Sequence, residues 1–556
     1  MKKKLLAALL SCAMLGTMLS GCGSNEAADS SAAASSAAEE ADDEDEAIEA
    51  DDEDEDVAEA DEAEGSLAEQ AIAERKAEAE ATGEYPKIVI SFFDWTGAPA
   101  GIDRINKALS EYGRENYGCD IELLIIDSAA YSDDLKLMLS SGEQVDLFST
   151  CGPGYTTCIN NDYLYDLEED DLLDTYGSKI HDYVRQDYLD ACRFGGTLYG
   201  VPPIKDYAIQ TCAIIVGTEY LDGIGYDYNS AKKDSLGFVE SNWDEITDIF
   251  GQIHEKYPDK YVYAIQDNSL TQGSSVDNIA GDYFGTLLDA SHSLKVEDVY
   301  ASDVWKEWCE RTYAWNQAGF ISKDALSDDT GASARVKSGA YMAMMSCGKP
   351  GYITQITGEC GRDVTVFNCG ESFMAAGSVS SFPWCMNQDT EDPVLAMQIL
   401  EAMYADSFIS NVLIWGMEGY EYQVLDDGTI DFAEGIDPNN SEYYPNVSWM
   451  MPNPYVAHVW KGDPLDIGEQ MSAFNDNCDN KSKALGFTWD NSDYSAEFTA
   501  LKNAYEEYGL TVEYGFVDPE KGIADLEAAL KAAGIEEYMA AKQEALDAWA
   551  AENGVN

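Results

Sequence analysis

The segment KIVISFFDWTG (residues 87–97) decides the fold class of this 556-residue chain. Its first seven residues form a short apolar run, and a polar and aromatic loop follows directly. Two more apolar runs, at residues 121–126 and 145–148, are separated from it and from each other by amphipathic segments at 101–117 and 132–142. Short apolar strands that alternate with helices are typical of an α/β fold with a parallel sheet. Because the carboxyl ends of such strands lie at one edge of the sheet, we expect their loops to line a crevice.

The loops after the first and third predicted strands supply the first candidate ligand-binding residues. Asp94 and Trp95 end the first strand, and Thr150, Cys151 and Gly152 follow the third. An aromatic ring packs on the apolar face of a sugar, while polar side chains hydrogen-bond the sugar hydroxyls. The alternative interpretation is a turn aspartate beside a tryptophan of the core.

The N-terminus has the features of a secretory signal with a lipobox. Three lysines at positions 2–4 precede an apolar run over residues 5–19, and the sequence LSGC occupies residues 19–22. This pattern predicts a lipoprotein signal peptide over residues 1–21 and a mature chain that begins at a lipidated, palmitate-bearing Cys22. The apolar run is too short to span a bilayer, which takes about 20 residues. We therefore expect a lipid anchor at the extracellular face of the cell membrane.

Residues 22–84 are predicted to form a lipidated, acidic and disordered stalk. Residues 39–64 contain 18 acidic side chains and no Lys or Arg, so they repel one another and extend the chain. Residues 66–82 are rich in Ala and Glu and favour a helix, but they have little apolar face. Calcium binding by the acidic run is the disfavoured alternative, because nothing holds its carboxylates in a fixed loop.

The composition restricts the partners of the folded body. The formal net charge is −72, and −54 remains without the 18 acidic residues of the run at 39–64. Such a surface repels nucleic acid, so we expect no nucleic-acid partner. Eleven of the 13 cysteines remain after signal removal and lipidation, and none forms a CxxC pair. In a body of this size we expect mostly free, buried thiols, with one or two disulfides as the alternative.

The sequence offers no convincing catalytic or metal-binding constellation. The four histidines (His181, His254, His292 and His458) show no HExxH or HxH spacing. Asn475, Asn477 and Asp479 alternate as in a calcium loop, but the turn glycine is missing, so we predict a polar surface loop. We therefore predict no catalytic residue, no metal and no cofactor. A surface-anchored glycoside hydrolase is the alternative, since 105 acidic residues supply carboxylate pairs by chance.

The C-terminal segment, residues 506–556, is predicted to contain a pair of helices. The first covers residues 526–533, and Gly534 separates it from the second. One face of the second helix is apolar and is interrupted once, by Lys542; its apolar members are Ile535, Tyr538, Met539, Leu546 and Trp549.

Several motifs, spread over residues 85–552, together resemble family 1 extracellular solute-binding proteins, the lipoprotein receptors of carbohydrate ABC importers. They are KLMLSSGEQVDLFST (136–150), FGGTLYGVPPIKD (194–206), VKSGAYMAMM (336–345), LIWGMEGYEYQV (413–424) and ALGFTWDNS (484–492). The last two, with residues 515–549, are similar to a Firmicutes lipoprotein subfamily with a characteristic C-terminal region.

The resemblance implies a two-lobed, periplasmic-binding-protein-like (type II) fold with a hinge and extra C-terminal helices. It implies lobe 1 at residues 85–206 with about 366–415, lobe 2 at 207–365 with about 416–505, and C-terminal helices at 506–556. The chain is expected to cross the hinge after residues 200–202, near 362–367 and near 415–420.

The resemblance also implies further ligand-binding residues. Lys205 and Asp206 lie at the hinge approach, with an interlobe salt bridge as the alternative role. Lys349 and Tyr352 follow the strand in VKSGAYMAMM. Three tryptophans are stacking candidates, with burial in the core as the alternative: Trp384, Trp415 and Trp449.

The function implied by the resemblance is that of a monomeric, lipid-anchored receptor. It would bind a sugar or oligosaccharide between its lobes and hand it to the permease subunits of an ABC importer. A receptor for a non-sugar ligand such as a peptide is the other alternative.

Overall fold

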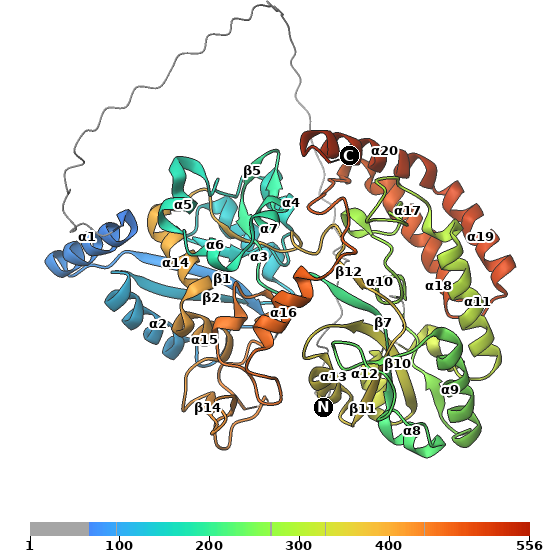
Figure 1. Ribbon diagram of the computed structural model, residues 1–556. Coiled ribbons are helices and arrows are strands. Elements are labelled where there is room, and N and C mark those ends of the chain that lie inside the picture. The colour runs from blue at the N-terminus through green and yellow to red at the C-terminus, as the bar shows by residue number, and fades with distance from the viewer. Residues whose placement is uncertain (1–65, 96, 267–268, 329, 439, 556) are drawn as a thin grey trace, which may run out of the picture.

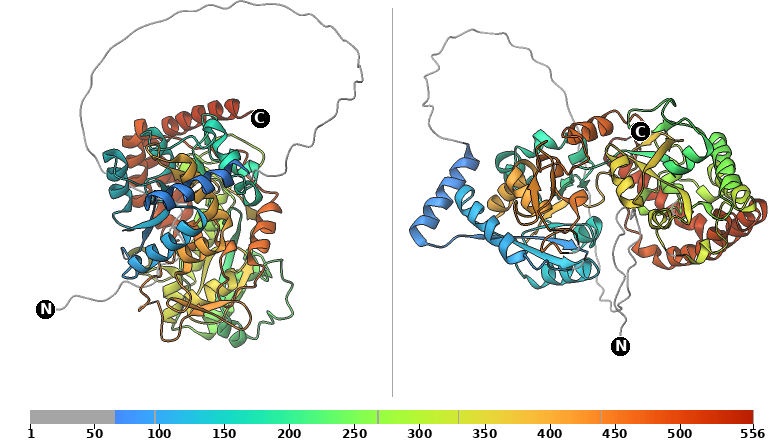
Figure 2. Two further views of the ribbon diagram at one scale, coloured as in Figure 1. Left: turned by 90° about the vertical axis from the view of Figure 1, so that its left-hand side faces the viewer. Right: turned by 90° about the horizontal axis from the view of Figure 1, so that it is seen from below.

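The computed structural model describes residues 66–555 apart from residues 96, 267–268, 329 and 439. Two lobes lie side by side, each built around its own sheet (Figures 1 and 2). The predicted signal peptide, the lipidation site Cys22 and the acidic run lie outside the described residues. Within the described part, no helix combines the length and apolarity needed to cross a bilayer.

The lobe 1 sheet confirms the parallel arrangement predicted from the first three apolar runs. Its strand order is β2-β1-β3-β13-β6, with β1 parallel to β2 and β3, and β13 antiparallel to β3 and β6. The strands are β1 (Lys87–Asp94), β2 (Asp120–Asp127), β3 (Leu147–Ser149), β6 (Gly200–Val201) and β13 (Trp384–Met386).

Helices cover both faces of the lobe 1 sheet (Figure 1). They are α2 (Ile102–Asn116), α3 (Tyr131–Ser141), α4 (Tyr155–Asn160), α5 (Leu172–Tyr176), α6 (Ile180–Tyr183), α7 (Gln186–Asp190), α14 (Pro393–Ala405), α15 (Ser407–Trp415) and α16 (Ile467–Asp476). Two small hairpins, β4 (Arg193–Phe194) with β5 (Thr197–Leu198) and β14 (Tyr422–Val424) with β15 (Ile430–Phe432), complete this lobe.

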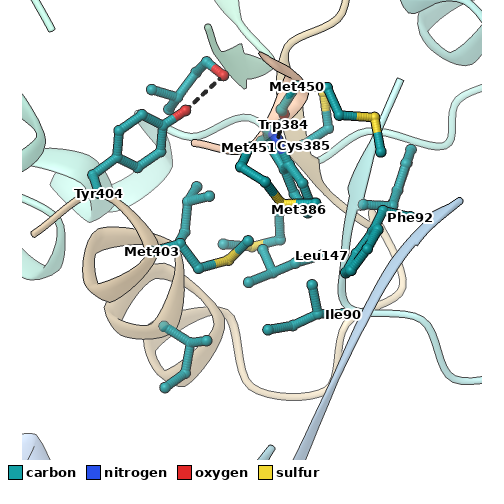
Figure 3. Packing of buried hydrophobic residues seen from close by; sticks show 14 of the residues in the cluster. Ile90, Phe92, Leu147, Trp384, Cys385, Met386, Met403, Tyr404, Met450 and Met451 are labelled. Atoms are coloured by element: carbon teal, nitrogen blue, oxygen red, sulfur yellow. Dashed lines mark hydrogen bonds between the residues drawn. The ribbon is translucent and has the colours of Figure 1, made fainter. Parts of the chain in front are cut away.

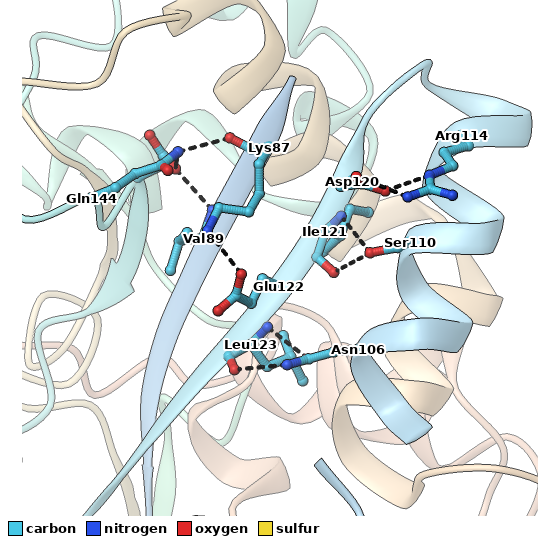
Figure 4. A network of polar contacts seen from close by, with 11 residues as sticks. Lys87, Val89, Asn106, Ser110, Arg114, Asp120, Ile121, Glu122, Leu123 and Gln144 are labelled. Atoms are coloured by element: carbon cyan, nitrogen blue, oxygen red, sulfur yellow. Dashed lines mark hydrogen bonds and ion pairs between the residues drawn. The ribbon is translucent and has the colours of Figure 1, made fainter. Parts of the chain in front are cut away.

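Polar side chains of α2 hydrogen-bond the backbone of β2 at the free edge of the lobe 1 sheet (Figure 4). Strand β2 is the edge strand, so one side of its backbone has no partner strand. Asn106 accepts a hydrogen bond from Leu123 N at 2.8 Å and donates one to Leu123 O at 3.3 Å. Ser110 makes the same reciprocal pair with Ile121, at 3.3 and 3.0 Å. The helix therefore covers an edge that would otherwise be open to pairing with another chain.

Lobe 2 contains a mixed sheet in the order β8-β11-β7-β10-β9, with β12 also paired to β7. Its strands are β7 (Ile209–Gly217), β8 (Val239–Glu240), β9 (Tyr261–Tyr263), β10 (Tyr341–Gly348), β11 (Val364–Asn368) and β12 (Ser372–Phe373). Its helices are α8 (Thr218–Ile224), α9 (Trp243–Lys256), α10 (Ser269–Gly273), α11 (Asp303–Gln317), α12 (Ala332–Ser338) and α13 (Tyr352–Cys360).

The C-terminal helices form part of lobe 2. They are α17 (Ser495–Ala504), a π-helical turn (Tyr505–Gly509), α18 (Leu510–Glu513), α19 (Pro519–Ala532) and α20 (Ile535–Glu552). The predicted helix pair is present as α19 and α20, separated at Gly534, which has a φ of 96°. Leu501, Leu526 and Leu530 are buried in one cluster with residues of the lobe 2 sheet. The predicted separate unit at 506–556 is therefore integrated into this lobe.

Three segments, here called the first, second and third crossings, connect the lobes. The first crossing (residues 202–208) joins β6 to β7, as predicted. The second crossing (residues 374–383) joins β12 to β13, and the third crossing (residues 478–487) leads from lobe 1 to α17. The second and third crossings run parallel, through Met374 N to Asn480 O at 3.0 Å and Ser482 N to Met374 O at 2.8 Å.

The predicted lobe boundaries in the second half of the chain need correction. Strand β11, which begins before the predicted return to lobe 1 at residue 366, pairs with β7 in lobe 2 along its whole length. Residues 443–457, predicted in lobe 2, contribute Tyr443, Met450 and Met451 to the core of lobe 1. Strand β11 therefore keeps the chain in lobe 2 beyond residue 366, and residues 443–457 keep it in lobe 1 beyond residue 420. The second and third crossings follow later, at 374–383 and 478–487.

The predicted start of the body at residue 85 is also too late. Helix α1 (Leu67–Thr82) lies on the outer side of lobe 1 (Figure 1). The Arg75 guanidinium donates to Tyr117 O and to Gln398 Oε1, both at 3.0 Å, and Gln398 donates back to Ala68 O at 2.8 Å. Polar contacts rather than an apolar face attach this helix to lobe 1. Its hydrophobic pattern therefore gives no sign that it packs against the body.

The prediction of free thiols is confirmed for the described residues. Among the described residues, the cysteines from Cys119 to Cys478 lie outside disulfides; Cys151, Cys347 and Cys369 are half-buried and the others are buried.

Candidate functional site

Six of the predicted site residues belong to a chain of contacts that reaches from lobe 1 across the first crossing to lobe 2, with Trp95 joined at its lobe 1 end through Phe93. We call them, together with Phe382, the interlobe cluster: Trp95, Cys151, Lys205, Asp206, Lys349, Phe382 and Trp449. Trp95, Cys151, Phe382 and Trp449 come from lobe 1 and the second crossing, Lys205 and Asp206 from the first crossing, and Lys349 from lobe 2. The cluster thus combines residues of both lobes and of the hinge.

Aromatic rings form the lobe 1 side of the cluster. The Trp95 ring lies 5.2 Å from Phe93, which is 6.3 Å from Trp449. Trp449 in turn packs edge-on against Phe382, with ring centroids 5.3 Å apart. The Trp95 side chain is 42% exposed, which is high for a tryptophan. Exposed aromatic faces of this kind suit the apolar faces of pyranose rings.

Charged groups form the hinge and lobe 2 side. Lys349 Nζ lies 3.1 Å from an oxygen of Asp206, and each side chain is 24% exposed. Lys205 Nζ lies 4.9 Å from the centre of the Phe382 ring. The predicted salt bridge at the hinge is thus present, with Lys349 rather than Lys205 as the closest cation of Asp206.

Burial and neighbouring charges set the protonation of this group. Burial raises the pKa of Asp206, but Lys349 and Lys205 outweigh that effect and leave the pKa below its ordinary value. Burial lowers the pKa of Lys205, and Asp206 opposes the shift. Burial raises the pKa of Cys151 to about 12, with Lys205 as a smaller opposing influence. The thiol is therefore neutral at physiological pH and is a poor nucleophile.

The sequence patterns did not predict three polar residues near the cluster. Asp463 interacts electrostatically with Lys349, and burial raises its pKa. Asp463 Oδ1 and the hydroxyls of Ser380 and Ser381 are buried without a hydrogen-bond partner among the described residues. Buried unpaired polar groups are unusual in native proteins, because each costs about 1–3 kcal/mol. No local motif marks these residues, since their position depends on the second crossing and on the loop after β15.

Three predicted residues lie behind this surface. Asp94 is 4% exposed, and Thr150, which is 1% exposed, donates its hydroxyl proton to Pro383 O at 2.9 Å. Gly152 has a φ of 125°, and a Cβ there would lie 2.9 Å from the Tyr131 ring. The Thr150 hydrogen bond joins the end of β3 to the second crossing. Thr150 and Gly152 therefore fix the backbone of the loop after β3.

Two aromatic predictions are corrected by burial. Trp384 has no exposed surface; it packs beside Phe92 and Met386, and its indole N–H donates to Met450 O at 2.6 Å (Figure 3). Tyr352 is 5% exposed and packs against Phe238 in lobe 2. Neither ring is accessible to a ligand, and both belong to the core.

Trp415 lies in a different environment from the interlobe cluster. Its ring pairs with Trp460 at 5.1 Å, and its N–H donates to His458 O at 2.9 Å. Among the described residues, its one ring contact is to Trp460. Surface depressions of about 510 Å³ beside β14 and about 310 Å³ between α9 and α11 are lined by none of the predicted residues.

Within the described part of the chain, no group of three or more His, Cys, Asp or Glu side chains is arranged to hold a metal ion. The histidines lie outside the interlobe cluster; His181 and His292, for example, pair with Asp174 and Asp289 in exposed positions. The cluster offers aromatic surfaces beside the charged groups of Lys205, Asp206 and Lys349.

Comparison with known proteins finds relatives of this chain over most of its length. Residues 483–551 match a family described as a domain of unknown function, DUF3502. A carbohydrate ABC transporter substrate-binding protein of Streptococcus pneumoniae is 19% identical over 463 residues, which cover 82% of this chain and 89% of that protein.

Solved structures share the two-lobed arrangement. The N-glycan transport solute binding protein (NgtS) of Streptococcus pneumoniae aligns with a TM-score of 0.70 at 18% identity, over 83% of this chain and 98% of that one. The same protein in complex with Man1GlcNAc aligns with a TM-score of 0.61 at 18% identity, over 83% of this chain and 99% of that one. The chain thus has the fold of the two-lobed solute-binding proteins, which confirms the resemblance indicated by its motifs.

Proposed function

We propose that this chain is the substrate-binding protein of a carbohydrate ABC importer, which binds a sugar or oligosaccharide between its lobes and delivers it to the permease. The observation that carries the proposal is the similarity to a protein of that description over 89% of its length. The fold shared with a solute-binding protein solved with a bound glycan supports it.

The interlobe cluster is the proposed ligand site. Trp95 and Trp449 would stack on sugar rings, while Lys205, Asp206 and Lys349 would hydrogen-bond hydroxyl groups. A hydroxyl-rich ligand also suits the unpaired oxygens of Asp463, Ser380 and Ser381, because a sugar hydroxyl both donates and accepts. Since the residues come from both lobes, a bound sugar would favour a closed arrangement.

The proposed location is the extracellular face of the cell membrane. The lipobox at residues 19–22 supports cleavage of a signal peptide and attachment of lipid to Cys22. We further propose that the receptor acts as a monomer that docks on the permease subunits.

Thermal unfolding in the presence of a panel of glycans tests the function. A ligand at 100 times its Kd stabilises the folded state by about 2.7 kcal/mol, which raises the midpoint by several degrees. We expect at least one mannose- or GlcNAc-containing oligosaccharide to do so. Stabilisation by peptides alone would contradict the carbohydrate assignment, and release of shorter glycans during overnight incubation would indicate a hydrolase.

A further inference from the structure

The single cation on the inner face of α20 is fully buried and fully hydrogen-bonded. Lys542 has no exposed surface, and its ammonium donates to Asp282 Oδ1 at 2.8 Å, Gly285 O at 3.1 Å and Ile279 O at 3.3 Å. These three acceptors match the three N–H groups of a lysine. Tyr538, one turn earlier, donates to the other oxygen of Asp282 at 2.9 Å. Helix α20 is thus fastened to the loop at residues 277–290.

That loop also holds the second and third crossings. Asp277 accepts a hydrogen bond from Ala376 N, in the second crossing, at 2.9 Å. Ala290 O accepts one from Lys483 N, in the third crossing, at 2.8 Å. The two crossings are bonded to each other as well, through Gly486 N to Ala376 O at 2.9 Å. The loop and the two crossings therefore form one hydrogen-bonded unit beneath α20.

Apolar packing adds to the polar fastening. One small buried cluster contains Leu546 of α20, Ala376 of the second crossing, and Ala484 and Phe487 of the third. The Trp549 ring packs edge-on against Phe487, with centroids 5.8 Å apart. In Figure 1, α20 extends from the other C-terminal helices of lobe 2 towards the middle of the molecule, above the region between the lobes.

The segment that matches the family of unknown function has no core of its own. The match begins at residue 483, inside the third crossing. The buried side chains of α17 to α19 pack into lobe 2, and those of α20 pack into the lobe 2 cluster or the small cluster over the crossings. The segment is therefore an extension of lobe 2 that reaches back onto the hinge.

We propose that this C-terminal segment is a clasp, which locks the second and third crossings to lobe 2 and so fixes where the hinge bends. With residues 374–376 and 480–486 held by α20 and the 277–290 loop, interlobe motion bends the chain at residues 377–383, at 477–479 and in the first crossing, and it shifts Met374 and Leu485 against the lobe 1 core on which they also pack. The inference concerns the hinge itself and holds for any ligand; its effect on sugar affinity rests on the proposed function.

Hydrogen exchange measured by mass spectrometry on the full mature chain, without ligand, tests the clasp. In the Lys542→Met variant we expect at least tenfold faster exchange at residues 374–376 and 480–486, with the lobe 1 strands and the first crossing unchanged. Lys531→Met is the matched control, because Lys531 is 69% exposed on α19 and pairs with Glu536 at the surface. The control should leave the exchange rates of both crossings as in the wild type.

Trp549→Ala is a milder variant, which removes the contact with Phe487 and leaves the buried ion pair in place. It should accelerate exchange at 480–486 by a smaller factor, and it decides the question if Lys542→Met fails to fold. Faster exchange confined to residues 535–552, with both crossings unaffected, would overturn the clasp. Because no glycan is present, this result is independent of whether the chain binds sugar.

Discussion

Two lysine–aspartate pairs in this molecule use the same side chains in opposite surroundings. Lys349 and Asp206, between the lobes, are 3.1 Å apart and each 24% exposed. Lys542 and Asp282, beneath α20, are 2.8 Å apart, with 0% and 8% of their side chains exposed. The first pair keeps contact with water, whereas backbone carbonyls and a tyrosine hydroxyl complete the second.

The difference fits the proposed binding role of the first pair and a structural role of the second. A partly hydrated pair exchanges water for sugar hydroxyls at little cost, because neither charge is left unpaired. A buried pair does not tolerate such exchange, since loss of either partner leaves an uncompensated charge away from water. We therefore expect mutations of the interlobe pair to change affinity, and mutations of the α20 pair to change stability.

The largest expected effect is that of Lys542→Met on stability. Because the variant leaves Asp282 buried without its cation, the free energy of unfolding should fall by about 3–5 kcal/mol in urea titrations. The double variant Lys542→Met/Asp282→Asn should recover part of that loss, as both charges are gone. A single variant as stable as the exposed control Lys531→Met would contradict the structural role of the pair.

The next effect concerns pH, through Asp277 beneath the same helix. Burial raises its pKa to about 6, although Ser482, Ala376 N and Lys542 partly offset the shift. A carboxyl whose folded pKa exceeds its unfolded value stabilises the folded state only while protonated, so this contribution is lost as the pH rises from about 4 to about 6.

In Asp277→Asn this contribution is absent. The difference in unfolding free energy between variant and wild type should therefore change by about 3 kcal/mol between pH 4 and pH 7, in favour of the variant at pH 7. The comparison is made by urea unfolding at each pH, with the exposed Asp289→Asn as the control. A difference that stays constant over this range would show that Asp277 does not titrate there.

Lys349→Met should affect mainly glycan affinity, whereas Lys542→Met should affect mainly stability. Because the pair is partly hydrated and Lys205 remains near Asp206, the unfolding free energy should change by no more than about 1 kcal/mol. Glycan affinity, measured by calorimetry, should fall about tenfold, while Lys306→Met on the outer helix α11 leaves it unchanged. Equal losses of stability in Lys349→Met and Lys542→Met would remove the distinction between the two pairs.

The smallest expected effect is that of removing the N-terminal segment. Deletion of residues 23–65 should leave both stability and glycan affinity unchanged, the latter within about twofold, or roughly 0.4 kcal/mol. Deletion of residues 23–84 should keep the affinity but cost about 1–3 kcal/mol of stability, because it removes the Arg75 partner of the buried Gln398. A tenfold loss of affinity in either deletion would show that this segment contributes to the ligand site.

The local pattern of the sequence predicted the first half of lobe 1 well. Strands β1 to β3 and helices α2 and α3 follow from apolar runs and helical periodicity, which are local properties. The later lobe boundaries depend on β11 joining β7 and β13 joining β3, pairings between residues far apart in the chain. Local pattern carries no information about such pairings, and family analogy placed the second and third crossings too early.

The same limit applies to the candidate site. Trp95 and Trp384 both lie at strands, yet one is 42% exposed and the other fully buried. Their exposure is decided by whether Met450 and Phe92 pack over the ring, which no local signal reports. Residues at strand ends and at the hinge approach were predictable, because fold topology brings such positions together. Asp463, Ser380 and Ser381 were not, because they arrive from loops with no motif.

The most direct test of the interlobe cluster as the sugar site is the calorimetric Kd of a binding glycan for the wild type and for Trp95→Ala. Tyr183→Ala is the control. The exposed fraction of Tyr183, 41%, is similar to the 42% of Trp95, but Tyr183 lies on α6 and outside the interlobe cluster. We predict that Trp95→Ala weakens binding at least tenfold, or about 1.4 kcal/mol, and that the control stays within twofold of the wild type. Wild-type affinity in Trp95→Ala, or an equal loss in Tyr183→Ala, would contradict the assignment of the interlobe cluster as the sugar site.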